Sequence, residues 1–242
     1  MIHIISRQCK FSATSANKTR PDWFSKEVCF RNLYHSITRD TVTMSVFFDG
    51  TEDEYRTSFV DDLWDGEYEC HPFYSEAKGF TYLILKIARE YDDDDIVYFC
   101  EDDYLHDRNW VPILREGFSI PNVDIVTLYD HKDKYDLNMY PDLKSQVFVT
   151  ESCHWRTVPS TCHTFGVKVK CIKELCSIWL KYSPETGTST DHEKFVELQQ
   201  NGARLISSMP GYATHVQPPW LSPITDWKGV HSISDVNCTE SA

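Results

Sequence analysis

Short apolar runs along the chain alternate with longer segments in which apolar residues recur every three or four positions. The short runs have the length and the β-branched and aromatic content of buried strands, and the longer segments have the periodicity of amphipathic helices. Within residues 77–91, for example, Phe80, Leu83, Ile84 and Ile87 recur at helical spacing. The pattern predicts strands at residues 2–6, 43–48, 68–72, 96–100, 124–129, 145–151, 164–169 and 204–208, and helices at 23–37, 77–91, 110–118, 171–182 and 191–201.

The segments between these elements are mostly polar or rich in proline and glycine. We expect residues 52–63 to form a loop or a short helix, and residues 130–141, 186–190 and 210–223 to form loops. Small polar residues at the end of the chain predict a flexible tail at 231–242.

The alternation of strands and helices predicts an α/β fold with a mixed, mostly parallel central sheet and helices on both faces. In such sheets, ligands bind beyond the carboxyl ends of the strands. Ser6 with Arg7, Asp49, and the acidic block Glu101-Asp102-Asp103 each follow a predicted strand. We therefore expect these side chains to meet at one edge of the sheet.

The acidic block directly follows the apolar run at residues 96–100. Three adjacent carboxylates at that place repel one another, and burial would remove their hydration. A divalent cation relieves both penalties, since Mg²⁺ and Mn²⁺ bind carboxylate oxygens, often together with substrate phosphates. The block therefore predicts a metal site, although most acidic turns are simply solvated.

The overall composition restricts the partners and the compartment. With 242 residues, of which 41% are hydrophobic, the chain can form one large globular domain. Its net charge of -13 argues against a nucleic-acid partner, which needs clustered Lys and Arg. No apolar run is long enough to span a membrane, and the N-terminus lacks the pattern of a secretion signal. The nine cysteines lack metal-binding spacing, and we expect reduced thiols in a soluble, cytoplasmic protein.

Several motifs, in their order along the chain, resemble those of GT-A fold glycosyltransferases of the kind found in large DNA viruses (chlorovirus-type) and in bacteria. They are Ile4-Ile5-Ser6-Arg7, Phe48-Asp49-Gly50, the block from Asp94 to His106, Thr190-Asp191-His192, and Pro210-Gly211-Tyr212-Ala213-Thr214-His215. The resemblance implies a single Rossmann-like GT-A domain at residues 1–230, in which residues 1–130 bind a nucleotide-sugar and 131–230 bind the acceptor. It also implies sugar transfer from a nucleotide-sugar, with UDP as the expected nucleotide, to a glycan or glycoprotein.

The same resemblance implies a metal-binding role for the acidic block. Glu101-Asp102-Asp103 occupies the place of the DxD motif, whose last aspartate usually holds a divalent ion on the donor diphosphate. Asp103 and the late His215 are therefore the expected ligands of Mn²⁺ or Mg²⁺, together with Glu101. Because the family has Asp where this chain has Glu101, a direct contact from Glu101 is the weaker expectation.

The resemblance also implies donor contacts around the metal. Asp102 is expected to contact the ribose or the sugar of the donor, and Asp49 the nucleobase or ribose. Ser6, Arg7 and Lys78 complete the expected donor site, in which the two cations would offset phosphate charge. An ordinary Asp-Gly turn would explain Asp49 equally well, and solvated surface positions would explain the cations.

An inverting transfer would need a carboxylate that takes the proton of the acceptor hydroxyl. Asp191, at the start of the last predicted helix, is the candidate base, and Glu193 is the fallback. Aspartate is also a favoured N-cap residue, so helix capping alone could account for Asp191. His163 and Trp220 are expected in the acceptor site, where a tryptophan ring can stack on a sugar, although both residue types also occur in cores.

Two other classes of protein remain compatible with the sequence. A metal-dependent phosphohydrolase would use the same acids, with further carboxylates around two metal ions. A non-catalytic carbohydrate-binding domain would need neither a metal nor a base, so turnover of a nucleotide-sugar would distinguish an enzyme from it.

Overall fold

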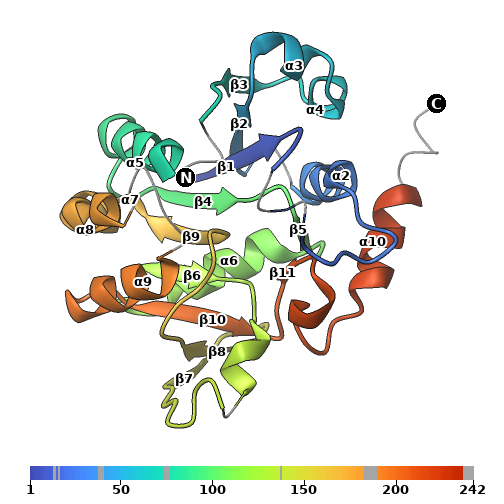
Figure 1. Cartoon of the computed structure of the whole chain (residues 1–242). Helices are drawn as coiled ribbons and strands as arrows, with labels where there is room; N and C mark the ends of the chain where they lie inside the picture. Colours follow the sequence, from blue (N-terminus) through green and yellow to red (C-terminus); the bar gives the residue numbers. More distant parts are fainter. Residues whose placement is uncertain are drawn as a thin grey trace.

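The computed structural model describes residues 1–12, 15, 17–37, 41–73, 77–136, 138–182 and 190–236. Within these residues a nine-stranded sheet forms the centre of the molecule, in the order β3-β2-β1-β4-β9-β6-β10-β8-β7, and β5 and β11 form a separate pair (Figure 1). The strands are β1 Ile2–Cys9, β2 Thr43–Asp49, β3 Glu67–Cys70, β4 Ile96–Cys100, β5 Tyr104–His106, β6 Ile125–Thr127, β7 Val147–Val149, β8 His154–Thr157, β9 Phe165–Lys168, β10 Leu205–Met209 and β11 Ala213–His215.

The central sheet is mixed but mostly parallel. β3, β2, β1 and β4 are parallel neighbours. β9 is antiparallel to β4 and β6 on either side, and β8 is antiparallel to β10 and β7. In the described sheet, β9 and β8 therefore run against the common direction of the other strands. The carboxyl ends of β1, β2 and β4 meet at one edge, as the sequence predicts.

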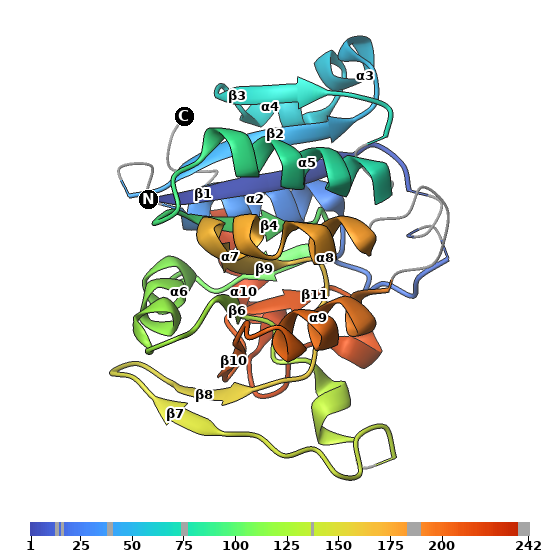
Figure 2. The same ribbon diagram turned by 90° about the vertical axis from the view of Figure 1, so that its left-hand side faces the viewer.

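Helices cover both faces of the sheet. They are α2 Lys26–Ser36, α3 Glu52–Arg56, α4 Phe59–Leu63, α5 Ala77–Glu90, α6 Trp110–Ser119, α7 Val169–Glu174, α8 Cys176–Lys181, α9 Asp191–Gln200 and α10 Trp227–Val236, with 3-10 turns η1 Lys132–Tyr135 and η2 Pro218–Trp220. α5, α7, α8 and α9 lie on one face, in front of the sheet in Figure 2, and α2 and α6 lie on the other.

The alternating side chains of β1 show how the two layers are built. Ile4 packs in the cluster that contains Phe30 of α2 and Leu114 of α6, whereas Ile5 packs with Ile84 of α5 and Trp179 of α8. Successive residues of a strand point to opposite faces, so a continuous apolar run serves both cores. This arrangement confirms the predicted α/β fold class.

The differences from the predicted elements concern short segments. The helix expected at 171–182 is divided into α7 and α8, and the loop expected at 210–223 contains β11 and η2. β5 and β8 were not predicted, because three or four residues are too short to show a strand period. α10 continues to Val236, into the segment expected as a tail at 231–242, and residues 237–242 lie outside the described part.

Two further observations concern the compartment. No helix in the described part of the chain is both long and apolar enough to cross a membrane. Eight of the nine cysteines lie in that part, and all eight are free thiols. The cytoplasmic location expected from the sequence stays a prediction.

Candidate active site

The β5–β11 pair brings His215 to the acidic block. The two strands are antiparallel, with His215 opposite Tyr104, and the backbone N–H of Val216 donates to the carbonyl of Asp103 at 2.9 Å. As a result Nε2 of His215 lies 2.9 Å from Oδ2 of Asp103. The two residues expected to hold a metal are therefore in direct contact.

Two cations from the segment between β1 and α2 also reach Asp103. Arg20 Nη2 lies 2.6 Å from Oδ2 of this carboxylate, and Lys18 Nζ lies 3.3 Å from the same oxygen. Burial by itself would raise the pKa of Asp103, but the contacts with His215, Lys18 and Arg20 outweigh burial and hold it well below its usual range. Asp103 is therefore a fully ionised, buried carboxylate surrounded by positive charge.

Asp102 lies where the ends of β1 and β2 meet the acidic block. Lys26 Nζ lies 2.6 Å from Oδ2 of Asp102, and the thiol of Cys9 donates to the same oxygen at 3.2 Å. Cys9 is paired in the sheet with Asp49, the last residue of β2. Burial and the negative charge of Asp102 raise the pKa of the Cys9 thiol to about 12, so it stays protonated as a donor. Asp102 and Asp49 therefore follow the two strands, β4 and β2, that flank β1, and Cys9 at the end of β1 lies between them.

Glu101 links this acidic block to the second half of the chain. Its carboxylate lies 3.9 Å from Nη1 of Arg7, and its backbone N–H donates to the hydroxyl of Thr164 at 3.1 Å. Burial and the charge of Asp103 raise the pKa of Glu101 to about 7, with a further contribution from the charge of Asp191. Thr164 follows His163, which contacts Asp191 at 2.6 Å, so adjacent residues of the segment before β9 connect Glu101 to Asp191.

Replacing Glu101 with glutamine is expected to stabilise the metal-free protein at pH 8 but not at pH 4. Between the ordinary pKa of 4.5 and the raised value of about 7, the unfolded chain releases a proton that the folded chain retains. The free energy of unfolding of the wild type therefore falls as the pH rises through this window, and glutamine removes that loss.

Thermal unfolding in EDTA at pH 4, 6 and 8 measures this difference. Glu193→Gln is the control, since it removes an exposed carboxylate. An equal gap in Tm between Glu101→Gln and the wild type at all three pH values would show that Glu101 titrates normally.

Asp191 begins α9, but it does not cap it. The N-cap position is occupied by Thr190, so the capping role considered for Asp191 is wrong. The Asp191 carboxylate instead lies 2.6 Å from Nε2 of His163 and accepts from Nζ of Lys194 at 2.9 Å, both through Oδ1. Asp191 is thus held by two side chains that leave its other oxygen, Oδ2, outside these contacts.

Lys194 is the charge that keeps Asp191 ionised. Burial alone would raise the pKa of Asp191, yet its pKa lies well below the usual range because of His163 and Lys194. Burial and the charge of Lys194 lower the pKa of His163 to about 4, so His163 is neutral near pH 7 and donates a hydrogen bond through Nε2. The Lys194 side chain is only 1% exposed, and its ammonium lies 4.8 Å and 5.0 Å from the ring centroids of Phe80 and Phe195. These aromatic faces help to accommodate a buried cation.

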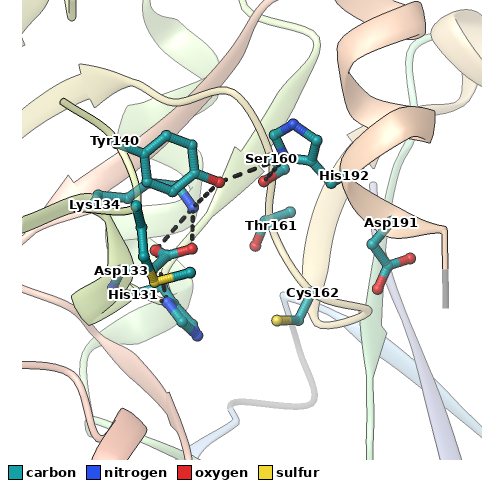
Figure 3. A pocket seen from close by; sticks show the side chains of 10 residues that line it. His131, Asp133, Lys134, Tyr140, Ser160, Thr161, Cys162, Asp191 and His192 are labelled. Atoms are coloured by element: carbon teal, nitrogen blue, oxygen red, sulfur yellow. Dashed lines mark hydrogen bonds and ion pairs between the residues drawn. The ribbon is translucent and has the colours of Figure 1, made fainter. Parts of the chain in front are cut away.

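A cavity of about 470 Å³ opens beside Asp191. Figure 3 shows one wall formed by side chains from the segment after β6, the opposite wall formed by the start of α9, and the segment before β9 between them. The lining residues are His131, Asp133, Lys134, Met139, Tyr140, Ser160, Thr161, Cys162, Asp191 and His192.

Polar and aromatic contacts fix these walls. Tyr140 and Ser160 lie within hydrogen-bonding distance of Nδ1 of His192, at 3.4 Å and 3.1 Å between the heavy atoms. His131 stacks on the ring of Trp220, with centroids 5.1 Å apart. Trp220 therefore supports a wall of the cavity, whereas His163 contacts Asp191 and is not among the lining residues.

For the remaining expected site residues, the structure shows no contact with Asp103 or Asp191 among the described interactions. The expectation that Ser6 and Arg7 follow the first strand is wrong, because β1 continues to Cys9 and both residues lie within it. Ser6 is fully buried, and its hydroxyl accepts from Nε2 of Gln8 at 3.0 Å. Lys78 is exposed in the first turn of α5, with its ammonium 5.5 Å from the ring centroid of Phe73. Donor contacts from Ser6, Lys78 and Asp49 stay predictions, and the exposed Glu193 stays the fallback base.

The structure adds four cations that the sequence analysis did not assign to the site. Lys18, Arg20 and Lys26 contact the acidic block, and Lys194 contacts Asp191. A sequence signal existed for the first three, since basic residues gather directly after the first strand in an otherwise acidic chain. The spacing of three residues between Asp191 and Lys194 was a second signal, because such residues lie on one helix face.

Comparisons with known proteins agree with the fold. No protein-family model and no curated protein matches the chain. The structure of CMP:2-keto-3-deoxy-manno-octonic acid synthetase complexed with CTP is 11% identical, and the match covers 98% of this chain and 99% of that one with a TM-score of 0.52. S. aureus TarS 1-349 is 12% identical, and the match covers 98% of this chain and 65% of that one with a TM-score of 0.53.

A weaker similarity extends to the galactosyltransferase LgtC in complex with donor and acceptor sugar analogues. It is 12% identical and covers 84% of this chain and 72% of that one, with a TM-score of 0.47. At identities this low, the matches to the synthetase and to TarS show a shared fold alone. They confirm the predicted Rossmann-like, GT-A-type architecture of the chain.

Proposed function

We propose that the protein is a glycosyltransferase that moves a sugar from a nucleotide-sugar, with UDP as the expected leaving group, to a hydroxyl of a glycan or glycoprotein. The observation that carries the proposal is the link between the acidic block and Asp191: the hydroxyl of Thr164 accepts from the backbone N–H of Glu101 at 3.1 Å, and the adjacent His163 contacts Asp191 at 2.6 Å. It supports a single site in which acids for a leaving diphosphate and a candidate base lie close together. The adjoining cavity is the space proposed for the acceptor.

A divalent ion at Asp103 would have to be held together with the donor, and it would have to displace Lys18 and Arg20 from the carboxylate oxygen that they contact. In the described part of the chain no group of three His, Cys, Asp or Glu side chains is arranged to hold a metal alone. Asp103 and His215 nevertheless offer a carboxylate and an imidazole in contact, and such ions often use one or two protein ligands together with substrate phosphates. This mixed pair suits Mn²⁺ at least as well as Mg²⁺. When bound, the ion would supply positive charge to the departing diphosphate.

The chain's own residues would carry out the rest of the transfer. We propose that Asp191 accepts the proton of the acceptor hydroxyl as this attacks the anomeric carbon, with inversion of configuration. Lys194 keeps Asp191 ionised, and His163 orients it through the hydrogen bond to Oδ1. Asp102 and Asp49, at the ends of the strands on either side of β1, would bind the hydroxyl groups of the donor.

The cavity beside Asp191 supports a carbohydrate acceptor. Its walls offer hydroxyl groups, an ion pair between Asp133 and Lys134, and the ring of Tyr140. Sugar hydroxyls both donate and accept hydrogen bonds, and their apolar ring faces stack on aromatic side chains. Trp220 would act on the acceptor through its stacking on His131.

Nucleotidyl transfer to a sugar is the second candidate. Arg7, Lys18, Arg20 and Lys26 all contact the acidic block, and this number of cations would suit a nucleoside triphosphate. The fold is also shared, over the full length of both chains, with a synthetase whose structure contains CTP. This reaction releases pyrophosphate, whereas glycosyl transfer releases a nucleoside diphosphate.

A panel of nucleotide-sugars and nucleoside triphosphates tests the proposal. Each compound is incubated with the protein with and without Mn²⁺, and the nucleotide products are separated by chromatography. Slow release of a nucleoside diphosphate from one nucleotide-sugar is expected, with acceleration by a glycan acceptor. Pyrophosphate release would favour nucleotidyl transfer, and hydrolysis of many phosphate esters a phosphohydrolase. Sugar binding without any turnover would indicate a carbohydrate-binding domain.

A further inference from the structure

β7 forms one of the two edges of the central sheet. β8 pairs with it on one side, and no strand of the described sheet pairs with it on the other. Figure 2 shows β7 at the lower rim of the molecule, with no labelled element beyond it. An edge strand presents a row of unpaired N–H and C=O groups, to which another strand can bind.

The pairing with β8 decides which backbone groups of this edge point outward. The backbone N–H of Thr150, directly after β7, donates to the carbonyl of Cys153 at 3.1 Å. In an antiparallel pair, the backbone groups of successive residues point alternately toward the neighbouring strand and away from it. The N–H and C=O groups of Val147 and Val149 therefore point away from β8.

The two edges of the sheet differ in their protection against pairing. At the opposite edge, β3 carries Glu67 and Glu69, and charges on an edge strand discourage the binding of a further strand. Residues 145–150, in contrast, contain neither a charged residue nor a proline. Val147 and Val149 are 58% and 69% exposed, so covering both would remove apolar surface from water.

A second copy of the same strand is complementary to this edge. When two copies of β7 lie antiparallel with Phe148 opposite Phe148, Val147 of one copy lies opposite Val149 of the other. The two valines then exchange both N–H···O bonds, and their side chains pack together on one face. The exposed Lys144 and Glu151 flank this segment at its two ends, so that unlike charges of the two copies come close there.

We propose that two copies of the chain associate through β7, in an antiparallel pairing centred on Phe148. The two nine-stranded sheets then form one continuous sheet, with α9 on the same face in both copies. A strand of another protein could bind the same outward groups, but a second copy supplies the matching valines and the flanking charges together. The pairing needs neither a metal nor a nucleotide, so it is independent of the proposed function.

Sedimentation equilibrium of the full chain over a range of concentrations measures the association. We expect a reversible dimer with a Kd of about 100 µM, because so short an interface lies at the weak end of specific contacts. Val149→Pro removes one outward N–H from each copy and leaves the bonds to β8 in place, so it should raise the Kd about tenfold or more. Val149→Lys should have the same effect by placing a charge on the edge. Leu85→Lys is the matched control, since it replaces an exposed apolar residue of α5 with the same cation and should leave the Kd unchanged.

Hydrogen exchange locates the contact. In the wild type, the amides of Val147 and Val149 should exchange more slowly in concentrated than in dilute protein, and Val149→Lys should remove this difference at Val147. A wild type that stays monomeric at about 1 mM would overturn the proposal, as would a dimer whose Kd is the same in both folded variants of Val149. The Tm of each variant shows whether it is folded. If neither is, exchange at both valines that does not depend on concentration in the wild type would overturn the proposal as well.

Discussion

Replacing Asp103 with alanine is expected to abolish the dependence of nucleoside-diphosphate binding on Mn²⁺. Asp103 is the buried carboxylate at the centre of the site, in contact with His215, Lys18 and Arg20. A metal ion on a diphosphate contributes several kcal/mol, so the wild type should bind about 10²-fold more tightly with Mn²⁺ than with EDTA. Without the carboxylate, the remaining cations would still attract phosphate, so the ratio of the two affinities should fall close to one.

The ratio is measured by calorimetry in Mn²⁺ and in EDTA. His215→Ala is expected to reduce it less, since the carboxylate and the diphosphate would still hold the ion. Asp53→Ala, which removes an exposed acid of α3, is the control for net charge. Because loss of Asp103 leaves Arg20 partly unpaired, Tm is measured as well, and Asp103→Asn provides a variant of the same shape. An unchanged ratio in a folded variant would remove the metal site from the proposal.

Asp191→Asn is expected to lower turnover about 10²- to 10⁴-fold while leaving nucleotide binding unchanged, because a general base typically contributes that factor. Asparagine has the shape of aspartate but cannot accept the proton of the acceptor hydroxyl. The contacts of the carboxylate with His163 and Lys194 strengthen this expectation, since they hold it ionised and oriented. The loss should appear in kcat for the acceptor reaction.

Two controls distinguish catalysis from stability. The neutral amide of Asp191→Asn would leave the buried Lys194 without its charge partner, so Asp191→Asn combined with Lys194→Met tests whether activity is lost for structural reasons. Glu193→Gln tests the fallback base. NMR of the anomeric proton in the product reports the configuration. Retention of the donor configuration, or near-normal turnover of a folded Asp191→Asn variant, would end the role of Asp191 as base.

The elements that the sequence predicts well are those whose signal is local. The helix at 77–91 and the strand at 96–100 match α5 and β4 closely, since burial gives the helix a clear period and the strand a continuous apolar run. The acidic block was found for the same reason, because three carboxylates stand out directly after an apolar strand. β5 and β11 were missed, since three-residue strands carry no period and form only by pairing with each other.

The assignment of Asp191 shows a second limit of local patterns. A sequence can place an aspartate near the start of a helix, but the N-cap differs from the first helical residue by one position. Here Thr190 takes the cap, and Asp191 turns to His163 and Lys194. Which role an aspartate takes depends on the side chains that the rest of the fold places beside it.

The sequence by itself determined the alternation of strands and helices, the edge of the sheet at which β1, β2 and β4 end, and the acids that stand there. These follow from the periodicity of burial and from the direction of parallel strands, which are properties of neighbouring residues. Only the tertiary structure decided which charges meet: His215 lies beside Asp103 although 112 positions separate them, and Lys18 and Arg20 join the same carboxylate. Contacts between distant segments depend on how strands pair and helices pack, and no local pattern encodes that choice.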